Sequence, residues 1–166
     1  MKKILLTTTY LLFINSSFAA DDAKISRLVR DYSETIACQV DGEGEPGELK
    51  QYSTVRLSEG YSAEDDLGSK WLVYWAGDVG CSGGNGSRQP QLTVVAINGF
   101  RNTPVVDTSY KLPDTNLVQV TEMKSDQGTV TISGLAYGDN DTQHAPRKKI
   151  TYKFKFDEQT NKIILQ

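Results

Sequence analysis

The sequence contains very little histidine and cysteine, with one His and two Cys among 166 residues. Zinc sites of the usual type draw three or four ligands from these residues, and a chain with no second His and no cysteine to spare from a disulfide cannot supply them. No glycine-rich phosphate loop closed by Lys-Ser/Thr is present, and the chain is too short for a Rossmann enzyme or a TIM barrel. We therefore expect a protein that uses no cofactor and no metal.

The sequence also lacks any apolar run of about 20 residues, the length that a membrane-spanning helix needs. Two lysines and an apolar stretch of about eleven residues, Ile4 to Ile14, open the chain. Ser17-Phe18-Ala19 then has the small-x-small pattern of signal-peptidase sites. We expect cleavage after Ala19, which leaves residues 20–166 as a single β-rich domain in the periplasm of a Gram-negative cell. An uncleaved membrane anchor is the alternative, and the short apolar stretch disfavours it.

Acidic residues outnumber basic ones. Removing Lys2 and Lys3 with the leader leaves 16 basic residues against 21 acidic ones, a net charge of −5. Such a surface does not suit nucleic acid, whose phosphates select basic faces. It suits a basic protein partner instead.

Export makes the two cysteines interpretable. An oxidising compartment favours disulfides, and two cysteines allow only one pairing, Cys38 with Cys81. In the chain-entropy model a loop of this length contributes on the order of 4 kcal/mol to stability. The alternative, a Cys nucleophile, would need a base from a chain that has a single His.

Apolar residues recur at intervals of three and four between Asp22 and about Ala37, which predicts an amphipathic helix. Asp21 or Asp22 is the expected N-cap. The predicted buried stripe consists of Ile25, Leu28, Val29, Tyr32 and Ile36.

After an acidic loop at Asp41 to Glu48, the pattern becomes one of short strands. Lys70–Ala76 and Gln91–Ile97 are apolar on both faces, so we expect them to be neighbours at the centre of a sheet. The chain from Ile150 to Phe156 alternates between apolar and polar residues. Further strands are expected at Lys50–Leu57, Pro104–Asp107, Asn116–Glu122, Gly128–Tyr137 and Lys162–Leu165. The predicted fold is α+β, mainly β, with an N-terminal amphipathic helix packed on an antiparallel sheet or flattened barrel of about eight strands.

One stretch between the two central strands is unusually rich in glycine, with five glycines in residues 77–88. We interpret it as a protruding recognition loop held by Cys81, because binding residues concentrate in loops on rigid scaffolds. A hairpin loop without a binding role is the alternative. The loop residues that we expect to contact a partner are Asp78, Ser82, Asn85, Ser87 and Arg88.

Asp139, Asp141 and His144 form a second candidate cluster. Their spacing is compatible with a calcium site, but the glycine and the distal glutamate of an EF-hand loop are missing. The sequence favours a solvated turn at this position.

Two further groups of residues are candidates for a binding or catalytic site. Trp71, Tyr74 and Trp75 are aromatic residues that could form a platform for a sugar. Their alternation within one strand favours packing in the core instead. Asp78 adjoins this strand and is a candidate carboxylate for a glycosidase, but the sequence offers it no evident partner.

A sequence pattern from Trp71 to Gly86 reads W-x-V-x-W-x-G-D-x-G-C-x-G-G-x-G. It resembles a pattern in small exported proteins of Gram-negative bacteria, and the C-terminal run from Gly134 to Phe154 resembles them more loosely. In architecture the chain is similar to small periplasmic inhibitors of cell-wall hydrolases and to immunity proteins that neutralise delivered hydrolases. The resemblance implies a non-catalytic protein whose loop plugs the active site of a basic hydrolase. A small-ligand or glycan-binding module and a carboxylate-dependent hydrolase remain the alternatives.

Overall fold

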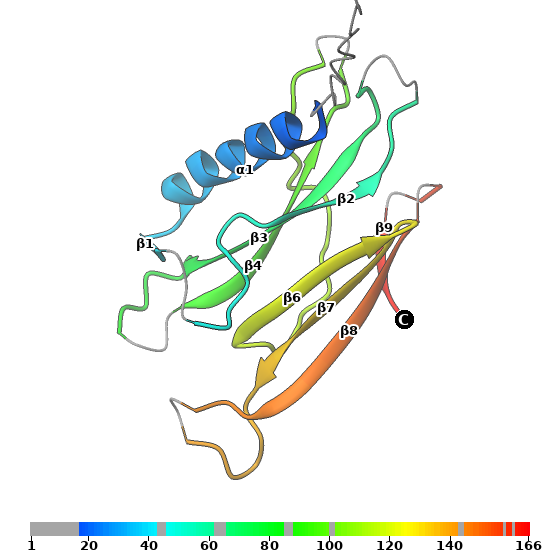
Figure 1. Cartoon of the computed structure of the whole chain (residues 1–166). Coiled ribbons are helices and arrows are strands. Elements are labelled where there is room, and N and C mark those ends of the chain that lie inside the picture. The colour runs from blue at the N-terminus through cyan, green and yellow to red at the C-terminus, as the bar shows by residue number, and fades with distance from the viewer. Residues whose placement is uncertain are drawn as a thin grey trace, which may run out of the picture.

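The computed structural model contains one helix followed by nine strands within the residues that it describes (Figure 1). These residues are 17–42, 46–61, 66–84, 88–99, 102–142, 145–157, 159–160 and 162–166. The elements are α1 (Ser17–Ile36), β1 (Gln39–Val40), β2 (Thr54–Ser58), β3 (Lys70–Asp78), β4 (Gln89–Ala96), β5 (Val105–Val106), β6 (Gln119–Asp126), β7 (Thr129–Ala136), β8 (Lys148–Asp157) and β9 (Lys162–Leu165).

The strands form two antiparallel sheets. The helix-covered sheet has the order β1-β3-β4-β5, with β2 also paired to β3, and the C-terminal sheet has the order β6-β7-β8-β9. Helix α1 packs on one face of the first sheet and the C-terminal sheet packs on the other, which gives three layers (Figure 1). The predicted class, a mainly β fold with an N-terminal helix on antiparallel strands, is confirmed. The strands are divided between two sheets.

Strand β3 is buried on both faces along its whole length. It pairs with β4 from Lys70↔Ala96 to Gly77↔Gln89, so the two strands predicted to be central neighbours are adjacent. Each large apolar side chain that is fully buried contributes roughly 1.5–3 kcal/mol. The side chains on the helix side are Trp71, Val73 and Trp75, and those between the sheets are Leu72, Tyr74 and Ala76.

Helix α1 covers the sheet with the stripe that its sequence predicts. Ile25 and Val29 are buried, whereas Ile36 at the C-terminal end of the stripe is exposed. The same side of the helix carries a fully buried serine, Ser33, whose hydroxyl lies 2.9 Å from the hydroxyl of Tyr52. The Ser26 hydroxyl, which contacts the Tyr52 carbonyl oxygen and the Thr54 hydroxyl, adds to this contact, so polar groups join the helix to the sheet beside a mainly apolar layer.

Several elements differ from the sequence prediction. Strand β1 was not predicted, and β6 begins three residues later and ends four residues later than expected. The helix begins at Ser17, so the prediction of an N-cap at Asp21 or Asp22 is wrong. The three residues before Asp21, Phe-Ala-Ala, contain no helix breaker that would start the helix later. Strand β2 begins at Thr54, four residues later than predicted. Tyr52 has a φ of 60°, a left-handed conformation that an extended strand does not contain, so this part of the chain forms a turn.

Strands β6 and β7 approach each other closely at a bulge between Val120 and Glu122. Gly134 of β7 is paired with Val120 at this place. A Cβ atom on Gly134 would overlap the carbonyl oxygen of Gln119 and lie 3.1 Å from the Cα atom of Val120. Glycine is therefore required here by the close approach of two backbones.

We predict that Gly134→Ala lowers the free energy of unfolding by about 2 kcal/mol, because the added methyl group must push the two strands apart. Urea-induced unfolding of the purified protein measures this change. Gly99→Ala is the matched control, since no atom lies within 4 Å of a Cβ at that position. Equal stability of the two variants would contradict the close approach.

Candidate functional site

The start of the glycine-rich loop is fixed to the segment that follows the helix. Strand β1 pairs with the end of β3, with Gln39 opposite Asp78, and the Cys38 amide donates to the carbonyl oxygen of Asp78 at 2.9 Å. Cys38 and Cys81 form a disulfide with a Cα–Cα distance of 5.3 Å. The predicted pairing is confirmed, and it ties the loop to the helix-covered sheet.

The carboxylate of Asp78 orders the next residues of the loop. It accepts hydrogen bonds from the backbone N–H groups of Ser82 at 3.1 Å and Gly83 at 2.9 Å. Asp78 is only 5% exposed, while residues 79–84 are exposed. Cys81, Gly83 and Gly84 have left-handed φ values, a conformation that glycine adopts without strain. The buried Asp78 carboxylate thus holds the loop backbone in place, and the exposed residues 79–84 form the rim of the loop.

Arg88 lies at the other end of the loop and is engaged by two carboxylates. Its guanidinium pairs with Asp41 and, at 2.5 Å, with Glu48. The Glu48 side chain is 6% exposed and that of Arg88 is 30% exposed, so the pair is largely shielded from water. Burial lowers the pKa of the Arg88 guanidinium. Burial, followed by the nearby Glu48 carboxylate, raises the pKa of the Tyr74 phenol well above its usual value.

These contacts bring together two loops that the sequence analysis treated separately. Asp41 and Glu48, the two ends of the acidic loop, are held by Arg88 at the base of the glycine-rich loop. Asp41 and Glu48 were not singled out in the sequence, although an isolated arginine in a glycine-rich stretch of an acidic chain is a signal for such a pair. Of the predicted contact residues, Ser82 is exposed, whereas Asn85 and Ser87 lie outside the described residues.

A groove of about 470 Å³ opens beside the acidic loop, between the C-terminal half of α1 and the turn before β2. Arg30 and Glu34 of the helix, Asp41 and Lys50 place charges of both signs along it. The Arg30 guanidinium lies 5.1 Å from the centre of the Tyr52 ring, within the range of a cation–π contact. The sequence pattern did not predict this groove, because its walls come from three separate segments.

The other candidate residues have structural roles. Trp71, Tyr74 and Trp75 are buried in the two cores, so their rings offer no face to a sugar. The Asp141 carboxylate accepts hydrogen bonds from the backbone N–H groups of Gly138 and Arg147, which hold its pKa below the usual value. Asp139 is exposed, and His144 lies outside the described residues. Among the residues that the structure describes, no group of three acidic, His or Cys side chains is placed to hold a metal.

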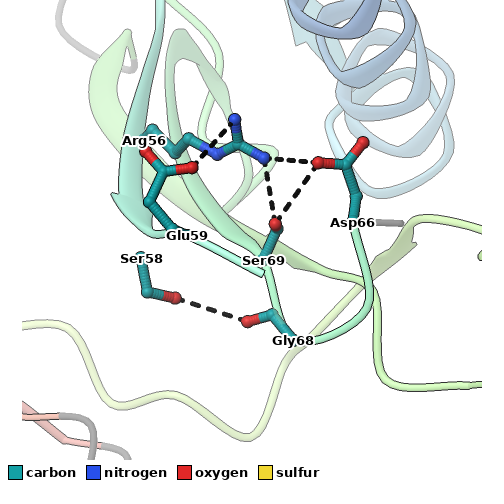
Figure 2. A network of polar contacts seen from close by, with 6 residues as sticks. All are labelled: Arg56, Ser58, Glu59, Asp66, Gly68 and Ser69. Carbon is teal, nitrogen blue, oxygen red and sulfur yellow. Dashed lines mark hydrogen bonds and ion pairs between the residues drawn. The ribbon is translucent and has the colours of Figure 1, made fainter. Parts of the chain in front are cut away.

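A second polar cluster lies at the opposite end of β3 (Figure 2). The Arg56 guanidinium contacts Glu59 at 3.2 Å, Asp66 at 2.5 Å and the Ser69 hydroxyl at 2.9 Å. It also lies 5.0 Å from the centre of the Trp71 ring. This cluster fixes the segment that leads into β3, so both ends of the central strand are held by an arginine and two carboxylates.

Comparison of the chain with protein-family models, with curated proteins and with solved structures finds no match in any of the three. Within the described part of the chain, no helix is long and apolar enough to cross a membrane.

We predict that Arg88→Met lowers the free energy of unfolding by about 2 to 3 kcal/mol, because it leaves the shielded Glu48 carboxylate without its counter-charge. Glu48→Gln should also destabilise the protein. The double variant should be more stable than the sum of the two single effects predicts, by on the order of 1 kcal/mol.

Urea-induced unfolding of the four proteins completes this double-mutant cycle. Arg27→Met, at an exposed position of the helix, is the matched control and should change stability by less than about 0.5 kcal/mol. Strictly additive single effects would show that Arg88 and Glu48 do not act as a pair.

Proposed function

We propose that this protein is a periplasmic binding protein without catalytic activity, and that it inhibits or neutralises a secreted or wall-directed hydrolase. The contact surface is the exposed rim of the glycine-rich loop, from Val79 to Gly84. The observation that carries the proposal is that this rim is exposed while its base is fixed by a disulfide, by β1 and by the buried Asp78 carboxylate.

A loop of this kind is suited to entering the cleft of another protein. Glycine-rich segments lose much conformational entropy on binding, and this loss opposes association. Here the hydrogen bonds from Ser82 and Gly83 to Asp78 order the backbone before a partner arrives. Val79, which is 40% exposed, gives the rim an apolar side chain that a cleft would bury.

The net negative charge of the chain supports a basic partner. The sequence from Asp41 to Glu48 contains four acidic residues, of which the first and the last are paired with Arg88 at the base of the glycine-rich loop. Opposite charge on a partner speeds association and suppresses wrong partners. The predicted net charge of −5 acts in the same direction.

The groove at Tyr52 favours a second candidate function, the binding of a small polar ligand. Its volume of about 470 Å³ is within the usual range for ligand sites, and Arg30, Glu34 and Lys50 supply charges of both signs. A ligand with both an anionic and a cationic group would fit this lining. The aromatic side chains of β3 do not contribute to it.

Shortening the whole loop is a poor test, because Ser82 and Gly83 bond to Asp78 and because Arg88 holds the acidic loop. We predict instead that the double variant Val79→Arg/Ser82→Arg keeps its stability and loses inhibition at least tenfold, about 1.4 kcal/mol. The added side chains enlarge the rim and repel a basic partner. The measurement is the rate at which a panel of hydrolases breaks down purified peptidoglycan by cleaving its glycosidic, amide or peptide bonds. The protein and its variants are recovered from periplasmic extract and added to each hydrolase.

The control is Thr108→Arg/Gln159→Arg, which adds the same charge at two exposed positions on other loops. It should inhibit as the unchanged protein does. If the unchanged protein inhibits no hydrolase of the panel, or if both double variants inhibit equally, the loop is not an inhibitory surface. Binding of a small zwitterion that Arg30→Ala abolishes would then favour the second candidate.

A further inference from the structure

The charges of this chain are distributed unevenly between its two ends. Residues 20–66 include 12 acidic and 5 basic residues, whereas residues 147–166 include 6 basic and 2 acidic ones. The first range contains the helix and the acidic loop, and the second contains β8 and β9. A chain with a net negative charge thus has a basic region within its C-terminal sheet.

Three of the four lysines of β8 are exposed on one face of this sheet. Lys149, Lys153 and Lys155 are exposed, while Phe154 and Phe156 between them are buried in the core. Side chains alternate between the two faces of a strand, so the three lysines lie on the face that points away from the helix-covered sheet. In Figure 1 this sheet is the outermost layer opposite the helix.

The neighbouring strands extend this face with polar, charged and apolar residues. On β6 the exposed Lys124 lies opposite Thr131, and the exposed Asp126 lies opposite Thr129. Across β7, Lys153 is paired with Thr131 and Lys155 with Thr129. Across β9, Lys155 is paired with Ile164, which is 50% exposed. We call this surface, made by Lys149, Lys153, Lys155, Thr129, Thr131 and Ile164, the lysine face.

Lys149, Lys153 and Lys155 form no ion pair within the described part of the chain, where the ion pairs involve other residues. Lys124 on β6 is paired with Glu122 at 2.6 Å. Asp157 at the end of β8 accepts hydrogen bonds from Thr160 and from the backbone N–H of Gln159, which lower its pKa, and the charge of Lys155 lowers it further. The positive charge of Lys149 and Lys153 is therefore available to an anionic partner, and that of Lys155 is partly offset by Asp157.

We propose that the lysine face binds the surface of a membrane that contains anionic phospholipids. Lys153 and Lys155 are separated by about 7 Å along the strand, and their side chains project from an open sheet surface. Such a row contacts many separated phosphates at once and does not enclose a single anion. Each lysine near an anionic bilayer contributes about a fivefold gain in affinity, and the exposed Ile164 suits the boundary between headgroups and acyl chains.

This docking leaves the glycine-rich loop free, because that loop belongs to the other sheet. The acidic end of the molecule is directed away from the anionic lipid, since like charges repel. The inference is independent of what the loop binds. It places the protein at the membrane surface, although no helix in the described part of the chain can span the membrane.

The test is cosedimentation with vesicles of phosphatidylcholine, with and without phosphatidylglycerol, at low and high salt. Protein recovered from periplasmic extract should bind the phosphatidylglycerol vesicles and be released by high salt, and it should not bind phosphatidylcholine alone. Lys149→Gln/Lys153→Gln/Lys155→Gln should weaken binding about 100-fold. Thermal unfolding should show that this variant remains folded, because the three side chains are exposed.

The matched control is Lys24→Gln/Arg27→Gln/Lys111→Gln, which removes the same charge at exposed positions outside the lysine face. It should retain binding within about fivefold. Equal losses in both triple variants would mean that net charge alone governs binding, and the proposal would be wrong. Absence of vesicle binding at low salt, or binding only to a soluble sulfated polysaccharide such as heparin, would also overturn it.

Discussion

The burial of strand β3 on both faces is the constraint on which the rest of this structure depends. One set of its side chains packs against the helix and the alternate set packs against the C-terminal sheet. Neither face can be left open, because each carries large apolar side chains whose exposure is unfavourable. The helix, the neighbouring strands and the second sheet are thereby arranged in three layers around a single strand.

The same strand ends at the candidate site, and this connects packing to function. Asp78 is the last residue of β3, so the core fixes the carboxylate that orders Ser82 and Gly83. The disulfide and β1 hold the loop from the side of the helix, and Arg88 holds its other end with two carboxylates. An exposed rim on a base of this kind is already ordered when a partner arrives, so binding costs less conformational entropy.

Much of this fold could be predicted from the sequence because the relevant patterns are local. The period of Ile25 and Val29 indicated the helix, and the two apolar faces of Lys70–Ala76 indicated the central strand. The pairing of Cys38 with Cys81 followed from their number. The roles of Arg88 and Glu48 could not be predicted, because they come from segments 40 residues apart whose meeting depends on the tertiary fold. The left-handed turn at Tyr52 was also missed, since it is held by contacts with the helix.

The central claim is that the first part of the glycine-rich loop, from Asp78 to Gly84, is ordered before any partner binds. Amide hydrogen exchange measured by NMR at Ser82 and Gly83 tests it most directly, since their N–H groups donate to the buried Asp78 carboxylate. The account predicts that both amides exchange slowly in the free protein and quickly in Asp78→Ala, while amides in the middle of β3 remain protected in both. Exchange of Ser82 and Gly83 in the unchanged protein at the rate of an unstructured chain would contradict the account.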